Sequence, residues 1–186
     1  MNALSAHPSR EIRKLGKRDI PEITRHLLRL DRRSRRSRFG ASVKDDFIRT
    51  YAGRIIGADA LVFGAFHDGR LRAIGEVRGL SQASPHEAEI AVSVEPEWQG
   101  EGIGGALFSR LVTAAQNRGI KVLHVLFLDK NKRMRSIVAK HHPRMRFDSG
   151  QVVATFDPPW ATPMSFAREI AQDAGACLRR VFQFAT

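Results

Sequence analysis

Hydrophobic residues recur with two different periods in the first half of the chain. A helical spacing follows Asp19–Glu22, where Asp19 or Ile20 caps the helix and Pro21 suits its first turn. Later, Asp68-Gly69 separates two apolar runs, which is the strongest short-range signal for a β-hairpin. In chain order the pattern predicts a strand at Glu11–Leu15, a helix carrying Ile23, Leu27, Leu28 and Leu30, a weaker helix at Val43–Arg54, and strands at Leu61–Phe66 and Leu71–Val77.

The second half alternates strands with helices. Ile90, Val92 and Val94 share one face of an alternating segment, and Gly119 lies where a helix commonly ends in a left-handed residue. The expected elements are a strand at Glu87–Val94, a helix at Gly102–Arg118, a strand at Lys121–Leu128, a basic helix at Lys132–His142 and a last strand at Gln151–Phe156. An antiparallel meander followed by a strand–helix–strand unit predicts an α/β or α+β class with a mixed sheet.

A further helix is expected at the C-terminal end, where Thr162-Pro163 provides a cap and a first turn. Its apolar stripe repeats at alternating spacings of three and four, through Met164, Ala167, Ala171, Ala174, Leu178 and Val181. We therefore expect residues 1–158 to form one domain and 159–186 a helical extension, packed on that domain or on the partner of a homodimer. Cys177 lies near the stripe and is expected to be a small core residue.

Composition sets the class of the molecule. Its 186 residues fit one domain, and 42% hydrophobic residues suffice for a core. A net charge of +12 points to an anionic partner such as nucleic acid, a membrane surface or a phosphate-rich cofactor. The single cysteine excludes an intrachain disulfide and disfavours a zinc site, so no metal is expected.

Targeting signals are the next feature of the chain. The apolar runs Ala60–Phe66 and Val122–Leu128 are too short to span a bilayer. The first ten residues, MNALSAHPSR, contain no apolar stretch typical of a secretory signal. A cytoplasmic protein is therefore expected.

A glycine-rich turn lies between a strand and a helix, at Trp98–Gly105. Its backbone amides, together with the helix dipole, suit a phosphate or pyrophosphate. Gly100, Gly102 and Gly105 satisfy the G-x-G-x-x-G pattern of nicotinamide-dependent enzymes, with Asp129 as a ribose-binding acid. However, Glu95–Gln99 separates the strand from the first glycine, and few residues follow Asp129, so the context disfavours a dinucleotide fold.

A second motif overlaps the first: Gln99-x-x-Gly102-x-Gly104, after a strand and a turn. It resembles the Q/R-x-x-G-x-G/A pyrophosphate loop of the GNAT superfamily of acyl-CoA N-acyltransferases, and 88–104 looks like that family's fourth strand and loop. The resemblance implies a GNAT fold, with a mixed, mostly antiparallel sheet flanked by helices. It also implies that acetyl-CoA lies between splayed strands at Glu87–Val94 and Lys121–Leu128. The cofactor-binding residues it implies are Val92, Ser93 and Val94 for pantetheine, and Gln99, Gly100, Gly102, Ile103, Gly104 and Gly105 for pyrophosphate. It also implies a cofactor contact for Asn131, at the start of the helix after Lys121–Leu128. Asn131 could equally be a simple helix cap.

Catalysis in such an enzyme needs a base, because an ammonium must lose a proton before it attacks a thioester. We expect Glu89 to be this base, with Glu87 and Glu76 as reserves, and a strand amide near Val92 to meet the developing oxyanion. A structural ion pair is an equally common role for a strand glutamate. Cys177 has no paired histidine, so direct attack in a ternary complex is expected.

The chain departs from the family where a tyrosine commonly protonates the leaving thiolate, because that position is Val138. Another acid is then required: Ser136, His141, His142 or water. The family implies an N-acetyltransferase acting on a primary amine of a small molecule or of a protein lysine or N-terminus. The departure and the positive charge keep a non-catalytic acyl-CoA-binding or nucleic-acid-associated module as an alternative.

Basic residues are concentrated in two segments of the chain. Residues 130–146 contain seven basic residues and no acid, and some of these could face the cofactor's 3′-phosphate. Arginines also crowd the segment Arg29–Arg38, which in the family borders the acceptor site. We expect this segment to be a solvated loop; an acidic acceptor or a nucleic-acid-associated partner is the functional alternative.

Overall fold

The computed structural model describes residues 11–80 and 86–183, with side chains up to Ala174. The strands are β1 (Glu11–Lys14), β2 (Ala60–His67), β3 (Arg70–Arg78), β4 (Glu87–Val94), β5 (Val122–Leu128), β6 (Arg144–Asp148) and β7 (Gln151–Phe156). The α-helices are α1 (Ile20–Arg29), α2 (Arg32–Phe39), α3 (Asp45–Arg54), α4 (Ile103–Gln116), α5 (Lys132–Ala139) and α6 (Pro163–Gln183), and short 3-10 turns occupy Lys17–Asp19 and Pro96–Trp98.

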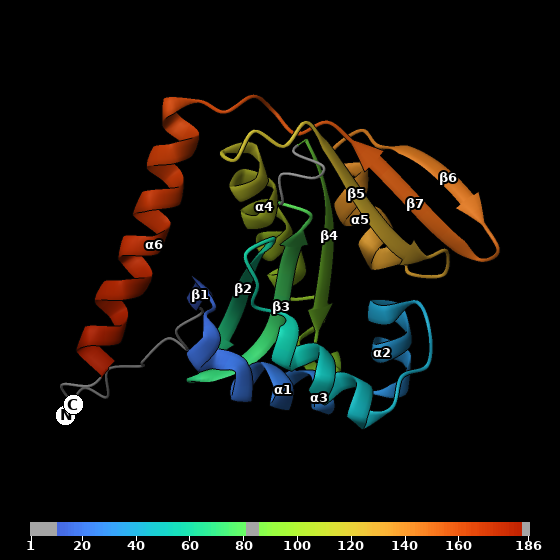
Figure 1. Cartoon of the computed structure of the whole chain (residues 1–186), viewed down its shortest axis with the longest axis horizontal. Helices are drawn as coiled ribbons and strands as arrows, with labels where there is room; N and C mark the ends of the chain where they lie inside the picture. Colours follow the sequence, from blue (N-terminus) through green and yellow to red (C-terminus); the bar gives the residue numbers. More distant parts are fainter. Residues whose placement is uncertain (1–10, 81–85, 184–186) are drawn as a thin grey trace, which may run out of the picture.

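All seven strands form one sheet in the order β1-β2-β3-β4-β5-β7-β6. Every neighbouring pair is antiparallel except β4 and β5, which are parallel. The expected mixed, mostly antiparallel sheet flanked by helices is therefore confirmed (Figure 1). The β2–β3 turn is the predicted one, and Asp68 and Gly69 both have positive φ there.

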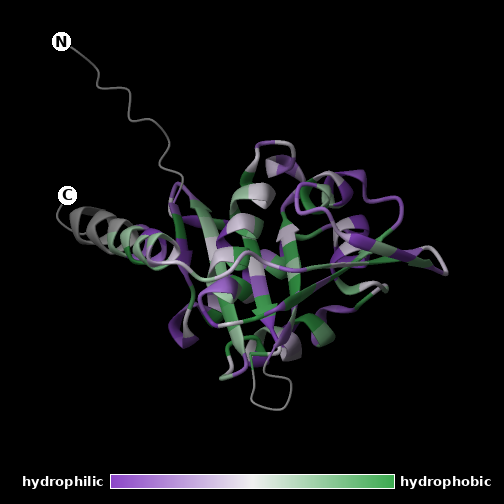
Figure 2. Cartoon of the chain, turned by 90° about the horizontal axis from the view of Figure 1, so that it is seen from above, coloured by the Kyte–Doolittle hydropathy of each residue, from purple (hydrophilic) through white to green (hydrophobic). Residues whose placement is uncertain are grey.

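Helices cover both faces of the sheet, and each face has its own core. On one face α4 buries Leu107, Phe108 and Leu111 against the strands. On the other face α1 and α3 bury Ile23, Leu27 and Ile48. Figure 2 shows hydrophobic residues along the central strands, between these helices. The amphipathic spacing seen in the sequence thus puts the apolar stripe of each helix on the sheet.

The segment that was expected to be an arginine-rich loop is instead a helix, α2. Asp31 caps it by accepting a hydrogen bond from the Ser34 amide at 2.7 Å, and Gly40 ends it with φ of 72°. Arginine has a high helix propensity, so two good caps suffice for an eight-residue helix that is held by its neighbours. The prediction of a loop was wrong because it considered charge and not the caps.

A strand, β6, was also missed. It pairs only with β7 and forms one edge of the sheet, and its exposed arginines suit an edge that must not pair with another chain. The basic helix expected at Lys132–His142 ends early, at Ala139, because β6 begins soon afterwards.

The C-terminal helix α6 packs against α4 and β1, at the side of the molecule away from β6 (Figure 1). Its contacts with α4 are polar: Arg110 pairs with Asp173, and Asn117 and Arg118 both bond Glu169. Met164, Ala167, Ala171 and Ala174 are all exposed, so the described part of the apolar stripe faces away from the domain. Leu178, Val181 and Cys177 lie outside the described side chains. None of the helices within the described ranges is long and apolar enough to cross a membrane.

Candidate functional site

The parallel strands β4 and β5 separate soon after they meet. They pair only from Glu87–Glu89 to Val122–His124. Beyond this point β4 stays paired with β3 as far as Val94, and β5 with β7 as far as Leu128. A wedge-shaped gap therefore opens in the middle of the sheet toward the carboxyl ends of the two strands.

Backbone groups of β4 point into this gap. The Glu95 amide donates to the Arg72 carbonyl of β3 at 3.0 Å, and backbone groups alternate in direction along a strand. The N–H and C=O groups of Val92 and Val94 therefore point toward β5, whereas those of Ser93 point toward β3. Val92, and Val94 through its N–H, can offer an extended ligand the hydrogen bonds that β5 does not make.

The glycine-rich turn lies at the open end of the gap. Gly100 and Gly102 have φ of 93° and 78°, a conformation that favours glycine, and Gly102 directly precedes α4. A Cβ at Gly100, Gly102 or Gly105 would meet nothing within 4 Å, so there is open space beside the turn. Ile103 differs from its neighbours, because its side chain is buried in the core. The amides at the start of α4 thus face solvent and suit an anion.

Gln99 and Asn131 extend the site from opposite sides of the gap. The Gln99 amide nitrogen donates to the Val94 carbonyl at 3.0 Å, and its oxygen accepts from Arg133 at 2.8 Å. Asn131 caps α5 by accepting a hydrogen bond from the Met134 amide at 3.1 Å, which is the helix-cap role that the sequence analysis gave as its alternative. Of the basic residues in 130–146, Arg133 is thereby placed beside the turn.

A buried network fixes the end of β4, and sequence analysis did not foresee it. His26 of α1 lies 3.1 Å from both the Ser93 hydroxyl and the Glu95 carboxylate. Glu95 also accepts from Arg29 at 2.8 Å and from Arg72 at 3.0 Å. Ser93, expected to contact the cofactor, therefore uses its side chain to hold α1 against the strand. The only sequence signal was the pair of polar residues at the end of an apolar strand.

Charge within this network is set by burial and by hydrogen bonds. Burial lowers the pKa of His26, and outweighs the opposing effect of Glu95. For Glu95, burial alone would raise the pKa, but hydrogen bonds from His26, Arg29 and Arg72 prevail and lower it from 4.5 to about 2. The network at neutral pH is thus a carboxylate held by two arginines and a neutral imidazole.

Glu89 lies on the face of the sheet opposite α4. In the register of the sheet it lies opposite Arg78 of β3. Glu76, two residues before Arg78 on β3, faces α2 and α3. Glu89 is exposed, and its side chain makes no hydrogen bond or ion pair within the described ranges. The carboxylate is thus accessible at the narrow end of the gap, where a base would be needed.

Two residues of β5 border Glu89 on this face. His124 is its partner in the parallel register and bonds Glu87 at 2.9 Å and Thr155 at 3.2 Å. Leu126 is 45% exposed, so its side chain is accessible on this face. His124 was missed as a site residue, although it is the one polar residue in the run Val122–Leu128.

Glu76, another candidate base, is already bonded to neighbouring side chains. It is buried and accepts hydrogen bonds from Arg38, Tyr51 and Arg78. Burial would raise its pKa, but the combined effects of Arg38, Tyr51 and Arg78 outweigh burial and lower it. Burial also raises the pKa of Tyr51 to about 12, so this only tyrosine is a poor acid. Glu87 is exposed and paired with His124.

The candidate acids for the leaving thiolate do not gather at the gap. Val138 is fully buried, and the Ser136 hydroxyl bonds its own helix at Lys132. His141 stacks on Phe156 with ring centroids 4.9 Å apart, and burial lowers its pKa. No cluster of three His, Cys, Asp or Glu side chains suited to a metal ion occurs in the part of the chain described.

The segment that carries this site matches a known protein family. Residues 24–141 match the model of the acetyltransferase (GNAT) family. The chain belongs to the GNAT acetyltransferase family. The match includes β4, the glycine-rich turn, α4, β5 and α5, and so the whole candidate site.

Solved GNAT structures share the fold at low sequence identity. The GNAT domain of PAT from S. lividans is 21% identical, with a TM-score of 0.66 over 78% of this chain and 89% of that chain. The ribosomal-protein-S18-alanine N-acetyltransferase of Escherichia coli is 16% identical, with a TM-score of 0.63 over 83% and 97%. The PaiA N-acetyltransferase of Thermoplasma acidophilum, solved in complex with coenzyme A, is 19% identical, with a TM-score of 0.59 over 80% and 99%.

The Glu95 network predicts a specific acid sensitivity. Because the folded-state pKa of Glu95 is below its unfolded value, its contribution is complete above about pH 4.5 and is lost as the pH falls toward 2. Glu95→Gln is expected to lower the free energy of unfolding at pH 7 by roughly 2–3 kcal/mol. Urea unfolding at several pH values measures this difference, which should shrink below pH 4.5. A difference that stays constant down to pH 3 would contradict the assignment.

The turn predicts how CoA binding responds to substitution. Gly104→Glu places a carboxylate among the amides expected to hold pyrophosphate, so CoA affinity should fall by at least about 100-fold. Gly104→Ala is the matched control: its Cβ would lie 3.5 Å from Ile137 and Val94, an ordinary contact, so binding should persist. Calorimetry with CoA measures both, and unchanged affinity of the Glu variant would exclude this site.

Proposed function

We propose that the chain is an N-acetyltransferase that transfers an acetyl group from acetyl-CoA to a primary amine by direct attack in a ternary complex. The observation that carries the proposal is the gap between β4 and β5, with a glycine-rich helix start at its open end and an exposed carboxylate, Glu89, at its narrow end. Two structures that share the fold contain this cofactor: the Thermoplasma acidophilum PaiA enzyme is in complex with coenzyme A, and yncA of Salmonella typhimurium is with acetyl-CoA. They support the choice of acetyl-CoA as the cofactor.

The residues present suit acetyl-CoA. The amides of Gly102, Ile103 and Gly104 would bind the pyrophosphate at the N-terminus of α4. Backbone groups of Val92 and Val94, which point into the gap, would pair with the amides of the pantetheine arm as a neighbouring strand would. Bound in this way, acetyl-CoA supplies the activated thioester carbon.

The acceptor amine reaches the gap from the face opposite α4. Glu89 takes the proton of the ammonium, so that a neutral amine attacks the carbonyl carbon. The exposed Leu126 provides apolar surface for the alkyl chain of the amine. A β4 amide near Val92 donates to the oxygen on which negative charge develops.

No side chain is assigned as the acid for the departing thiolate. Val138 has no ionisable group, and Tyr51 is bound to Glu76, with its pKa raised to about 12. Water at the open gap is the proton donor that the geometry leaves. This step therefore does not depend on a tyrosine in this chain.

The first test is acetyl transfer with acetyl-CoA and a panel of amines, followed by thiol release. Glu89→Gln should lower kcat by about 100-fold and leave CoA affinity unchanged, because the amide keeps the shape but cannot accept the proton. Glu97→Gln, at an exposed position outside the gap, is the matched control and should keep full activity.

Calorimetry separates the proposal from its alternatives. Acetyl-CoA should bind saturably, whereas NADH and a short DNA duplex should not. Absence of acetyl-CoA binding would overturn the enzyme assignment, and binding of acetyl-CoA without transfer to any amine would favour a non-catalytic binding module. An unchanged rate for Glu89→Gln across the pH range would remove Glu89 as the base.

A further inference from the structure

The helix α2 bridges the open end of the gap between β4 and β5. Ser34 lies 3.4 Å from the Gln99 amide nitrogen, beyond the end of β4. Ser37 accepts from Asn131 at 2.7 Å, beyond the end of β5. The inner side of α2 is thus in contact with the residues at the two carboxyl ends of the gap.

Two arginines anchor this helix. Arg38 is buried and bonds Glu76 and Tyr51, which ties α2 to β3 and α3. Arg35 donates to the carbonyls of Leu28 and Leu30 at 2.7 and 2.9 Å and pairs with Asp45 at 2.6 Å. These contacts hold α2 in one position over the sheet.

Of the three other arginines of α2, Arg33 is exposed and interacts electrostatically with Asp31. The remaining two, Arg32 and Arg36, lie on the outer side of the helix. Both are exposed, and neither has a hydrogen-bond or ion-pair partner among the residues described. Arg32 stands in the first turn, near the positive end of the helix dipole, and Arg36 is four residues further on the same side. The dipole disfavours Arg32, and repulsion between like charges four residues apart disfavours the pair, whereas Arg36 in the last turn is at the favoured end of the dipole. Arg32 therefore does not serve the stability of the helix.

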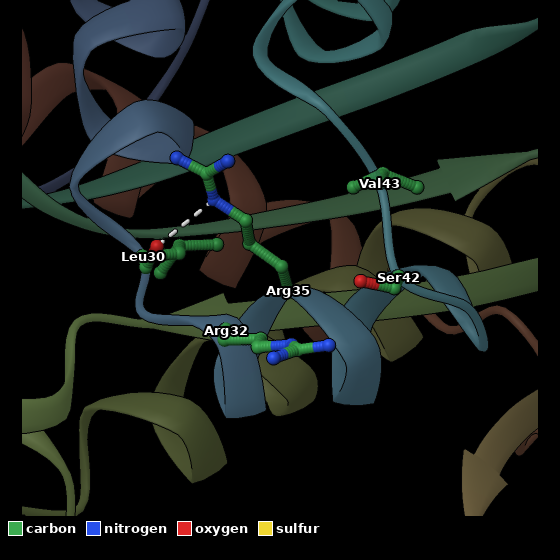
Figure 3. Close-up of a pocket in the computed structure, with 5 residues that line it drawn as sticks. All are labelled: Leu30, Arg32, Arg35, Ser42 and Val43. Carbon is green, nitrogen blue, oxygen red and sulfur yellow. Dashed lines mark hydrogen bonds between the residues drawn. The ribbon is translucent and has the colours of Figure 1, made fainter.

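A hollow lies beside them. It has a volume of about 370 Å³ and is lined by Leu30, Arg32, Arg35, Ser42 and Val43 (Figure 3). Figure 3 shows Arg32 along the outer side of α2, while Arg35 is directed toward Leu30. This surface offers a free cation beside a recess large enough for one side chain of a ligand.

We propose that Arg32 and Arg36 form a docking surface for an acidic peptide segment that flanks the acceptor amine. The inference rests on the proposed function, because that function places the amine on this same face. Charge complementarity selects the partner, since two unpaired guanidinium groups attract carboxylates. A peptide is favoured over nucleic acid because a lysine or an N-terminus supplies the aliphatic amine, which unmodified nucleic acid lacks.

The test compares two peptides, each with a single lysine, flanked either by glutamates or by glutamines. The wild type should acetylate the glutamate peptide with a KM lower by about 3- to 10-fold, a preference that should weaken at high salt. Arg32→Gln/Arg36→Gln should abolish the preference while leaving kcat and the KM for the glutamine peptide unchanged. The control variant Arg54→Gln/Arg168→Gln removes the same charge from exposed positions on α3 and α6. It should retain the preference for the glutamate peptide.

Stability and direct binding complete the design. The α2 variant should unfold at the same or a higher temperature, whereas a lower temperature would show that the arginines serve the fold. Fluorescence anisotropy of the labelled glutamate peptide, without acetyl-CoA, should show binding that depends on Arg32 and Arg36. If this binding occurs but no amine is acetylated, the proposed function fails and the docking surface stands.

Two outcomes would overturn the docking surface itself. One is acetylation with equal KM for both peptides in the wild type. The other is a DNA or RNA oligonucleotide that displaces the glutamate peptide and binds more tightly through the same two arginines, which would assign the surface to nucleic acid.

Discussion

The separation of β4 and β5 is the constraint on which the rest of the structure depends. Three residue pairs join the strands, after which each keeps only its outer neighbour. Backbone groups in the interior of a sheet need partners, so an open gap is a cost that a bound extended ligand would offset. The network around Glu95 joins α1, β3 and the end of β4 at this point, and so fixes one wall of the gap before any ligand is present.

In the proposed reaction, the two substrates would use opposite faces of one sheet. The glycine-rich turn leads into α4, which covers one face, and Glu89, His124 and Leu126 lie on the other. A thioester within the gap would be within reach from both faces. Helix α2 contacts both sides of the gap, because its serines bond Gln99 and Asn131. In the proposed function, cofactor binding and acceptor recognition would therefore share one short helix.

Several elements of the fold and the glycine-rich turn were predictable, because residues close together in the sequence determine them. Asp68-Gly69 specified a hairpin, and the alternation in Glu87–Val94 specified a half-buried strand. The glycine motif placed the turn before α4. Long-range contacts were not predictable: nothing local shows that His26 meets Ser93, or that Arg38 crosses to Glu76. The helix α2 was missed because its stability comes from caps and from such contacts, and β6 because edge strands tolerate the charges that argue against a strand.

The most direct test is diffraction from crystals of the protein with coenzyme A. The account predicts pyrophosphate density at the amides of Gly102–Gly104, and a pantetheine arm running between β4 and β5, with its amides hydrogen-bonded to Val92 and Val94. Coenzyme A bound outside this gap, for example against Arg32 on the outer side of α2, would contradict the account.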